Sequence, residues 1–277
     1  MKTLVKVFNW LLMALGVLLS IHALTRQRTG PNLYRAVNHE VTGLDNSTQN
    51  SFSYVVFSDP QFGLLNIVDE DGDGTAWAND LTNMRHLASQ INSLHPRPSF
   101  VFITGDLSNA YPESPRVEIP GRDDHVLNGF KSPYRTPQTV DLLDALTLID
   151  GDIPIMVNAG NHDMMEDPDD LSVGAFEHVW GDSFYTFWSH GRFFISLETQ
   201  FFRTTKSTKL LNQEMKWLEE VFTNVEVAMP KTVLMHVPLF IDNVNETDSD
   251  KGNGQIRRSM KIPTSFNKSS YEDIVIP

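Results

Sequence analysis

The amino-acid sequence predicts a layered α/β fold in which short buried strands alternate with amphipathic helices. Residues 54–57, 100–103 and 153–157 form apolar runs rich in β-branched and aromatic residues, each bounded by Pro, Gly, Asp or Asn. Such runs are typical of buried strands. A chain of 277 residues with 40% hydrophobic content is long enough to bury one large core. The alternation of strands and helices favours sheets covered by helices.

Apolar residues at helical spacing predict three helices, and two adjacent runs predict a hairpin. The helical stripes span residues 81–94, 142–149 and 211–222. Residues 184–188 and 193–197 flank a short turn that contains glycine, which predicts an antiparallel pair of strands. We interpret the helical stripes as core contacts without a functional role.

Each of the first three predicted strands is followed by a carboxylate or a carboxamide side chain. Asp59 follows the first strand, Asp106 the second and Asn161 the third. In layered α/β folds, ligands bind beyond the carboxyl ends of the strands. A turn or a helix cap would explain any one of these residues. The ordered set of three instead predicts convergent oxygen ligands and therefore a divalent metal site.

The chemistry of a two-metal site assigns a role to each candidate ligand. Two ions about 3.5–4 Å apart can clamp a phosphoryl group and activate a water between them. Asp106, from the middle strand, is expected to bridge both ions. Asp59 is expected to hold the first ion and Asn161 the second. His236 closes a further apolar run, residues 232–235, and offers an imidazole to the second ion.

Two residues beside the third ligand are candidates for catalysis. His162 is expected to protonate the leaving oxygen and not to bind metal. Asp163 is expected to fix the tautomer of that imidazole, as carboxylates often do. The mixture of oxygen and nitrogen ligands suits manganese, iron or zinc, so the expected cofactor is a pair of such divalent ions.

These residues resemble the motifs of the calcineurin-like metallophosphoesterases, which are D-x-H, G-D, G-N-H-[DE], a later His and finally G-H-x-H. The resemblance is closest to the branch of serine/threonine phosphatases with D-P-Q-F-G in the first motif. It implies a β-sandwich flanked by helices, hydrolysis of a phosphate ester by a metal-activated water, and a phosphorylated small molecule or phosphoprotein as substrate. The matching segments are residues 59–64, 135–142, 180–182, 200–201 and 236–240.

Two positions depart from the family pattern. Gln61 stands where the general pattern has a His ligand, as is usual in the resembled branch. No G-H-x-H follows His236, although the resemblance places one ligand for each ion in that motif. We therefore expect the C-terminal part of the fold to be missing from this chain. The alternative to a working phosphoesterase is a catalytically impaired homologue that binds phosphate or a partner without turnover.

The N-terminus has the layout of a secretory signal. A basic start precedes an apolar stretch shorter than the roughly 20 residues that a membrane span prefers. Residues 1–23 are therefore expected to be a signal peptide or a signal anchor, which would make the protein secreted, lumenal or membrane-anchored. Asn46, Asn245 and Asn267 begin glycosylation triplets in that case.

The expected domain organisation follows from these segments. The metallophosphoesterase domain, incomplete at its C-terminus, is expected over residues 52–240. A polar linker is expected over residues 24–51 and a polar divergent tail over residues 241–277.

Charge and cysteine content exclude several functional classes. The formal net charge of −13 argues against nucleic-acid binding through a general basic surface. The absence of cysteine excludes disulfides and thiolate metal sites.

One acidic stretch, residues 69–80, resembles a calcium-binding loop. It has carboxylates at alternate positions and a glycine in sixth place. Its twelfth residue is Asp80 where such loops have a bidentate Glu. A solvated acidic loop is the competing interpretation.

Overall fold

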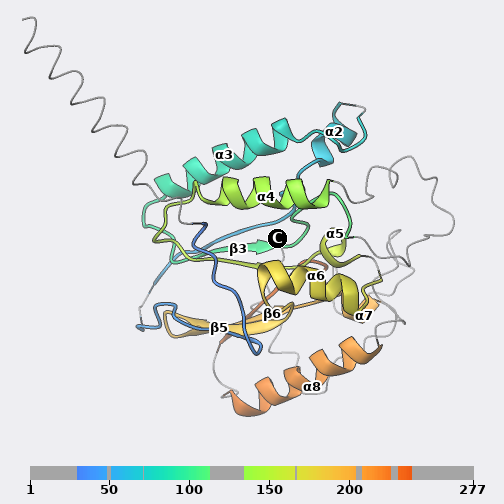
Figure 1. Ribbon diagram of the computed structural model, residues 1–277. Coiled ribbons are helices and arrows are strands. Elements are labelled where there is room, and N and C mark those ends of the chain that lie inside the picture. The colour runs from blue at the N-terminus through green and yellow to red at the C-terminus, as the bar shows by residue number, and fades with distance from the viewer. Residues whose placement is uncertain are drawn as a thin grey trace, which may run out of the picture. The chain divides into compact units, whose positions relative to one another are not determined.

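Two β-sheets face each other between layers of helices in the described part of the chain (Figure 1). The computed structural model describes residues 30–48, 51–70, 72–112, 134–165, 167–203, 208–225 and 230–238. The predicted signal segment, the predicted tail and the triplets at Asn245 and Asn267 lie outside these residues. No helix among the described residues is long and apolar enough to cross a membrane.

The first sheet has three parallel strands in the order β2-β3-β4. They are β2 (Val55–Phe57), β3 (Val101–Thr104) and β4 (Ile155–Asn158). The sequence prediction of these strands is confirmed. Because all three are parallel, their carboxyl ends lie at one edge of the sheet, where the candidate ligands follow.

Within the described ranges, the second sheet has four strands in the order β1-β5-β6-β7. They are β1 (Glu40–Val41), β5 (Tyr185–Ser189), β6 (Arg192–Leu197) and β7 (Lys231–Met235). The predicted hairpin is confirmed as the antiparallel pair β5 and β6. Strand β7 runs parallel to β6, so its carboxyl end also lies at a common edge with that of β6.

Alternating side chains of each strand divide the core into layers. Phe100, Phe102 and Met156 of the first sheet pack against Phe187 and Phe194 of the second. The rings of Phe187 and Phe194 stack with centroids 4.7 Å apart. The intervening residues of the same strands point the other way, toward the helices.

Helices cover the outer faces of both sheets. α3 (Ala78–Ser93) and α4 (Arg135–Leu146) pack on the first sheet, and α8 (Thr208–Asn224) packs on the second. Figure 1 shows α3 and α4 on one side of β3 and α8 beyond β5 and β6. These are the three predicted helices. Among the residues that the structure describes, four shorter helices were not predicted: α2 (Leu64–Val68), α5 (Asn161–Met164), α6 (Asp170–Trp180) and α7 (Gln200–Arg203).

The segment predicted as a polar linker over residues 24–51 contains ordered structure, which corrects that prediction. Leu33 forms a parallel bridge with Ile155 of β4. Strand β1 pairs with β5 in the second sheet. Ala36 and Val41 are each 3% exposed. The packed unit therefore begins well before residue 52, because backbone hydrogen bonds hold a segment whose side chains are mostly polar.

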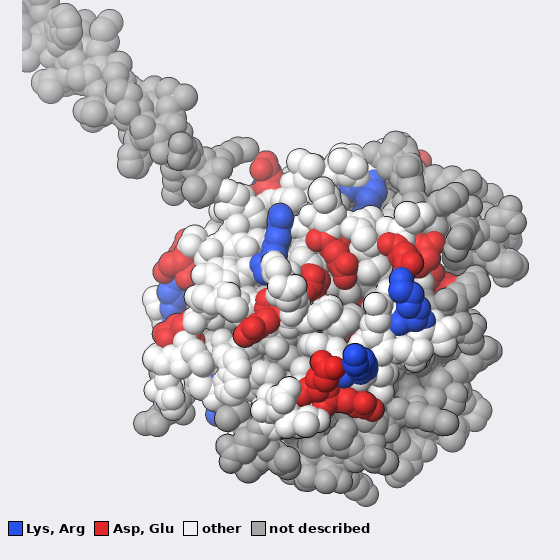
Figure 2. Space-filling view, turned by 60° about the horizontal axis from the view of Figure 1, so that its bottom comes forward, with Lys and Arg blue, Asp and Glu red and all other residues white. Residues whose placement is uncertain are grey.

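Acidic and basic side chains are interspersed on the face of the protein that Figure 2 shows. On the face drawn in Figure 2, Lys and Arg side chains are separated by Asp, Glu and uncharged residues. The described residues on that face therefore form no continuous basic patch.

Candidate metal centre

The candidate ligands that follow the strands converge at the carboxyl ends of the two sheets. Asp59 follows β2, Asp106 follows β3, Asn161 begins α5 after β4, and His236 follows β7 directly. Ligand atoms of Asp59, Asp106 and His236 all lie within 4.8 Å of one another. They form the one such group of three or more His, Asp or Glu side chains among the described residues.

His236 presents one defined nitrogen to this group. Its Nδ1 lies 2.7 Å from the carbonyl oxygen of Thr104, which can only accept, so Nδ1 carries the proton. Its Nε2 lies 3.4 Å from Oδ1 of Asp106 and 3.2 Å from Oδ1 of Asn161. The lone pair of Nε2 thus points at two oxygen ligands, and a backbone carbonyl supports the imidazole as in many metal sites.

The turns that carry the ligands have strained backbones. Asp59, Gln61 and Asp106 have φ values of 56°, 35° and 52°, in the left-handed region that few residues other than glycine adopt. Backbone hydrogen bonds hold two of these turns together: the Asp59 N–H donates to Gly105 and the Gln61 N–H to Asp106. Strain of this kind gathers at functional sites, where the surrounding structure enforces it.

Gly160 leaves open the space in which the ligands meet. A Cβ at this position would lie 2.8 Å from Nε2 of His236 and 2.5 Å from the backbone nitrogen of Asp106, and it would overlap Oδ1 of Asp106. The backbone of Gly160 is extended, so only space and not conformation requires glycine here. The donor set of two carboxylates, an amide oxygen and an imidazole nitrogen, converging on this gap, fits the divalent ions predicted from the sequence.

Replacing Gly160 with alanine is therefore expected to weaken Mn²⁺ binding by roughly 10–100-fold, the range seen when the support of metal ligands is disturbed. Calorimetric titration of the metal-free chain with Mn²⁺ would measure this change. Gly174→Ala in α6 is the matched control, because a Cβ there meets nothing within 4 Å. Equal Mn²⁺ affinity of the Gly160→Ala variant and the unmodified chain would contradict the placement of the site.

His162 is oriented by the loop after β3. Its Nδ1 lies 2.7 Å from the carbonyl oxygen of Asn109, and its ring stacks on Tyr111 with centroids 4.4 Å apart. Its backbone N–H donates to Oδ1 of Asp106. The expectation that Asp163 fixes the tautomer of His162 is corrected, because the Asn109 carbonyl occupies that position. The N–H at Nδ1 donates a hydrogen bond to this carbonyl. Nε2 is therefore the ring nitrogen that can give or take a proton.

Asp163 is instead a buried anchor for the two loops that carry ligands. It is 0% exposed and accepts hydrogen bonds from the backbone N–H groups of Leu107 and Gly160. Nη2 of Arg135 lies 3.4 Å from its Oδ1, and Nη1 of the same residue donates to the carbonyl of His162. Burial raises the pKa of Asp163, and the charge of Arg135 opposes that rise.

Sequence reasoning assigned no role to Arg135, although this residue falls within a segment of the family resemblance. Its Nη1 also donates to the carbonyl of Ala110, so it connects α4 to the turns after β3 and β4. In the sequence, a single Arg in the first turn of a helix does not indicate that its side chain will bind buried carbonyl groups. Only the resemblance pointed to that segment.

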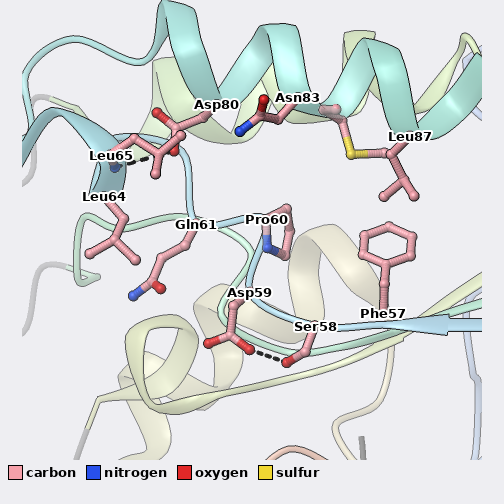
Figure 3. A pocket seen from close by; sticks show the side chains of 11 residues that line it. Phe57, Ser58, Asp59, Pro60, Gln61, Leu64, Leu65, Asp80, Asn83 and Leu87 are labelled. Atoms are coloured by element: carbon pink, nitrogen blue, oxygen red, sulfur yellow. Dashed lines mark hydrogen bonds between the residues drawn. The ribbon is translucent and has the colours of Figure 1, made fainter. Parts of the chain in front are cut away.

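Gln61 and Asp80 both lie beside the turn that follows β2. Gln61 is 5% exposed, and its side chain points in the same direction as that of Asp59 (Figure 3). The carboxylate of Asp80 accepts from the N–H groups of Gly63 and Leu65. Asp80, twelfth in the acidic stretch, is therefore buried against backbone groups outside that stretch and is not a solvated side chain.

Comparison with known proteins places the chain in a family. The chain matches the calcineurin-like phosphoesterase family over residues 52–264, a range that extends beyond the predicted domain end at residue 240. Serine/threonine-protein phosphatase CPPED1 of Bos taurus is 31% identical over 203 residues, covering 71% of this chain and 59% of that protein. The human protein of that name is 31% identical over 206 residues with the same coverage.

Two further matches have different coverage. CPPED1 of Danio rerio is 31% identical over 224 residues, covering 77% of this chain and 67% of that protein. The solved structure of purple acid phosphatase PPD1 from seeds of Lupinus luteus is 15% identical with a TM-score of 0.40, covering 70% of this chain and 32% of that one. This chain thus spans about three-fifths of the length of the mammalian relatives that it matches.

Proposed function

Because the chain belongs to the calcineurin-like phosphoesterase family, we propose that it hydrolyses phosphate esters at the centre formed by Asp59, Asp106, Asn161 and His236. The observation that carries the proposal is the convergence of ligand atoms from both sheets within 4.8 Å. When bound, two divalent ions would polarise the phosphoryl group and lower the pKa of an attacking water.

The four ligands divide by their positions in the site. Asp106 is the proposed bridging ligand, since its Oδ1 lies 3.4 Å from Nε2 of His236 while its turn is also bonded to that of Gln61. Asp59 would hold one ion. Asn161 and His236 would hold the other, because their ligand atoms lie 3.2 Å apart.

His162 is the proposed general acid. The Asn109 carbonyl holds its Nδ1 proton, so a proton on Nε2 is the one available for the leaving oxygen. Asp163 and Arg135 are positioning residues, since they bind the backbone that carries Asn161 and His162. Misplacement of such groups by about 1 Å can cost about a hundredfold in rate.

The proposed substrate is a phosphorylated alcohol or phenol. The support comes from relatives that are named serine/threonine-protein phosphatases. Hydrolysis of the substrate's P–O bond would release inorganic phosphate and the free hydroxyl compound, with one water consumed.

Asp106→Asn is expected to lower kcat/KM for phenyl phosphate in the presence of Mn²⁺ by roughly a thousandfold or more, because it removes a charge that both ions need. Asp170→Asn is a matched control, since that carboxylate is 70% exposed and is not one of the proposed ligands. Equal turnover by the Asp106→Asn variant would overturn the proposal. A folded chain that binds phosphate but turns over no ester would instead support the binding protein considered above.

A further inference from the structure

An apolar cavity of about 280 Å³ opens beside the metal centre. Side chains of β2, the following turn, α2 and α3 form its wall. Figure 3 shows Phe57 and Leu87 approaching each other from opposite sides, with Pro60 between them and Asp59. The apolar lining residues are Phe57, Pro60, Leu64, Leu65, Met84 and Leu87.

The cavity borders the proposed catalytic site. Asp59 and Gln61, which belong to the ligand turn, also line it. In Figure 3 the side chains of Asp59 and Gln61 point away from α3, while Asn83 and Leu87, which also line the cavity, extend from α3. Because Asp59 and Gln61 belong both to the ligand turn and to the wall of the cavity, a group attached to a phosphoryl unit held at Asp59 would lie beside the cavity.

The charge of the lining selects against an anionic occupant. Asp59 and Asp80 line the cavity, and the described residues around it include no Lys, Arg or His. Burial is the main cause that raises the pKa of Asp80, which reflects the apolar surroundings. The phosphate itself is thus excluded, and the walls favour an uncharged apolar group.

The size of the cavity indicates a subsite for part of a substrate. Pockets that enclose a whole drug-sized ligand usually measure about 300–1,000 Å³, and this one is slightly smaller. We propose that the cavity binds the leaving group of the ester and makes the enzyme prefer phosphate monoesters of apolar alkyl or aryl alcohols. The preference for turnover rests on the proposed function, whereas binding of the apolar group does not.

A pair of esters with the same reactivity tests this preference. Phenyl phosphate and 4-butylphenyl phosphate differ by four carbons that leave the acidity of the phenol nearly unchanged. Each methylene group moved from water to apolar surroundings strengthens binding by roughly fourfold. Partial burial of the butyl group is expected to raise kcat/KM about tenfold over phenyl phosphate. Leu87→Gln and Leu65→Gln are expected to reduce that ratio to below about twofold.

Leu94→Gln is the matched control, because Leu94 ends the same helix, is 43% exposed and lies outside the cavity. It should retain the tenfold ratio. Circular dichroism of each variant establishes that it is folded. Because there are two independent cavity variants, the test still works if one of them does not fold. A ratio near one in the unmodified chain, or a ratio that both cavity variants retain, would overturn the inference and leave the proposed function intact.

A second readout does not depend on turnover. Calorimetric titration of the metal-free full chain with 4-butylphenol should give binding that Leu87→Gln weakens about tenfold and Leu94→Gln does not change. Loss of turnover of both esters together with this Leu87-dependent binding would overturn the proposed function and support the apolar site. Binding of 4-butylphenol that is insensitive to Leu87 and to Leu65 would overturn the site itself.

Discussion

Replacing Arg135 with methionine is expected to lower the free energy of unfolding by about 3–5 kcal/mol, the usual cost of leaving one member of a buried ion pair without its partner. The carboxylate of Asp163 is 0% exposed, and the side chain of Arg135 is 15% exposed. Urea unfolding of the metal-free chain would measure the change. Turnover should also fall, because the carbonyl of His162 loses its guanidinium donor.

The pH dependence of this variant has a defined sign. Burial already raises the pKa of Asp163 above its ordinary value, and loss of Arg135 raises it further. A raised pKa in the folded state contributes stability at low pH that is lost as the pH rises through that pKa. The loss in free energy of unfolding caused by Arg135→Met is therefore expected to be larger at pH 8 than at pH 5.

Two comparisons separate this effect from the general loss of an arginine. Arg97→Met removes an ion pair with Asp150 and Asp152 on the surface, where side chains of 40%, 46% and 70% exposure make the pair a weak one. The double variant with Asp163→Asn should lose less stability than the sum of the two single variants. Additive losses, or an Arg135→Met cost equal to that of Arg97→Met, would rule out a coupled buried pair.

Glu214→Gln is expected to stabilise the protein at neutral and alkaline pH. Glu214 is 0% exposed in α8, and its Oε1 accepts a hydrogen bond of 2.8 Å from the backbone N–H of Glu198. Burial raises its pKa well above the ordinary value of a glutamate. The amide oxygen of glutamine can accept the same bond without an ionisable group.

The sign of the effect follows from proton linkage. The folded state retains the proton of Glu214 at pH values where the unfolded state has lost it, so stability declines as the pH rises from about 4.5 toward the folded pKa. The decline is at most about 1.4 kcal/mol per pH unit for one group. Glu198 adds a similar decline, because burial and the nearby carboxylates of Glu214, Asp163 and Asp106 all raise its pKa.

Urea unfolding at pH 5.5, 7 and 8.5 distinguishes the outcomes. The advantage of the Glu214→Gln variant over the unmodified chain should grow with each step in pH. Glu219→Gln on the exposed side of the same helix is the control and should follow the curve of the unmodified chain. A constant difference between the Glu214→Gln variant and the unmodified chain at all three pH values would contradict a protonated buried carboxyl.

The positions of the ligands could be predicted because strand ends have clear sequence signals. Asp59, Asp106 and Asn161 each follow an apolar run, and the parallel arrangement of three strands brings their side chains together. His236 comes from the second sheet, so its approach to Asp106 depends on how the sheets pack. The family resemblance supplied that relation, since local periodicity in the sequence contains no information about it.

Other contacts had no signal in the sequence. The carbonyl of Asn109 orients His162, and any residue at position 109 would offer such a carbonyl. Glu214 lies at helical spacing from apolar neighbours, but a glutamate is normally interpreted as a surface residue. These contacts follow from the packing of distant segments, which propensity and pattern do not determine.

The segment that precedes the family match has a consequence for any shortened form of this protein. The N–H of Tyr34 donates to Ile155, and the N–H of Ile155 donates to Asn32, at the outer edge of β4. A few residues later, the N–H of Thr186 in β5 donates to the carbonyl of His39. One short stretch of chain therefore closes an open strand edge in each sheet. A fragment cut at residue 52, where the family match begins, would expose both edges to other chains and would be prone to self-association.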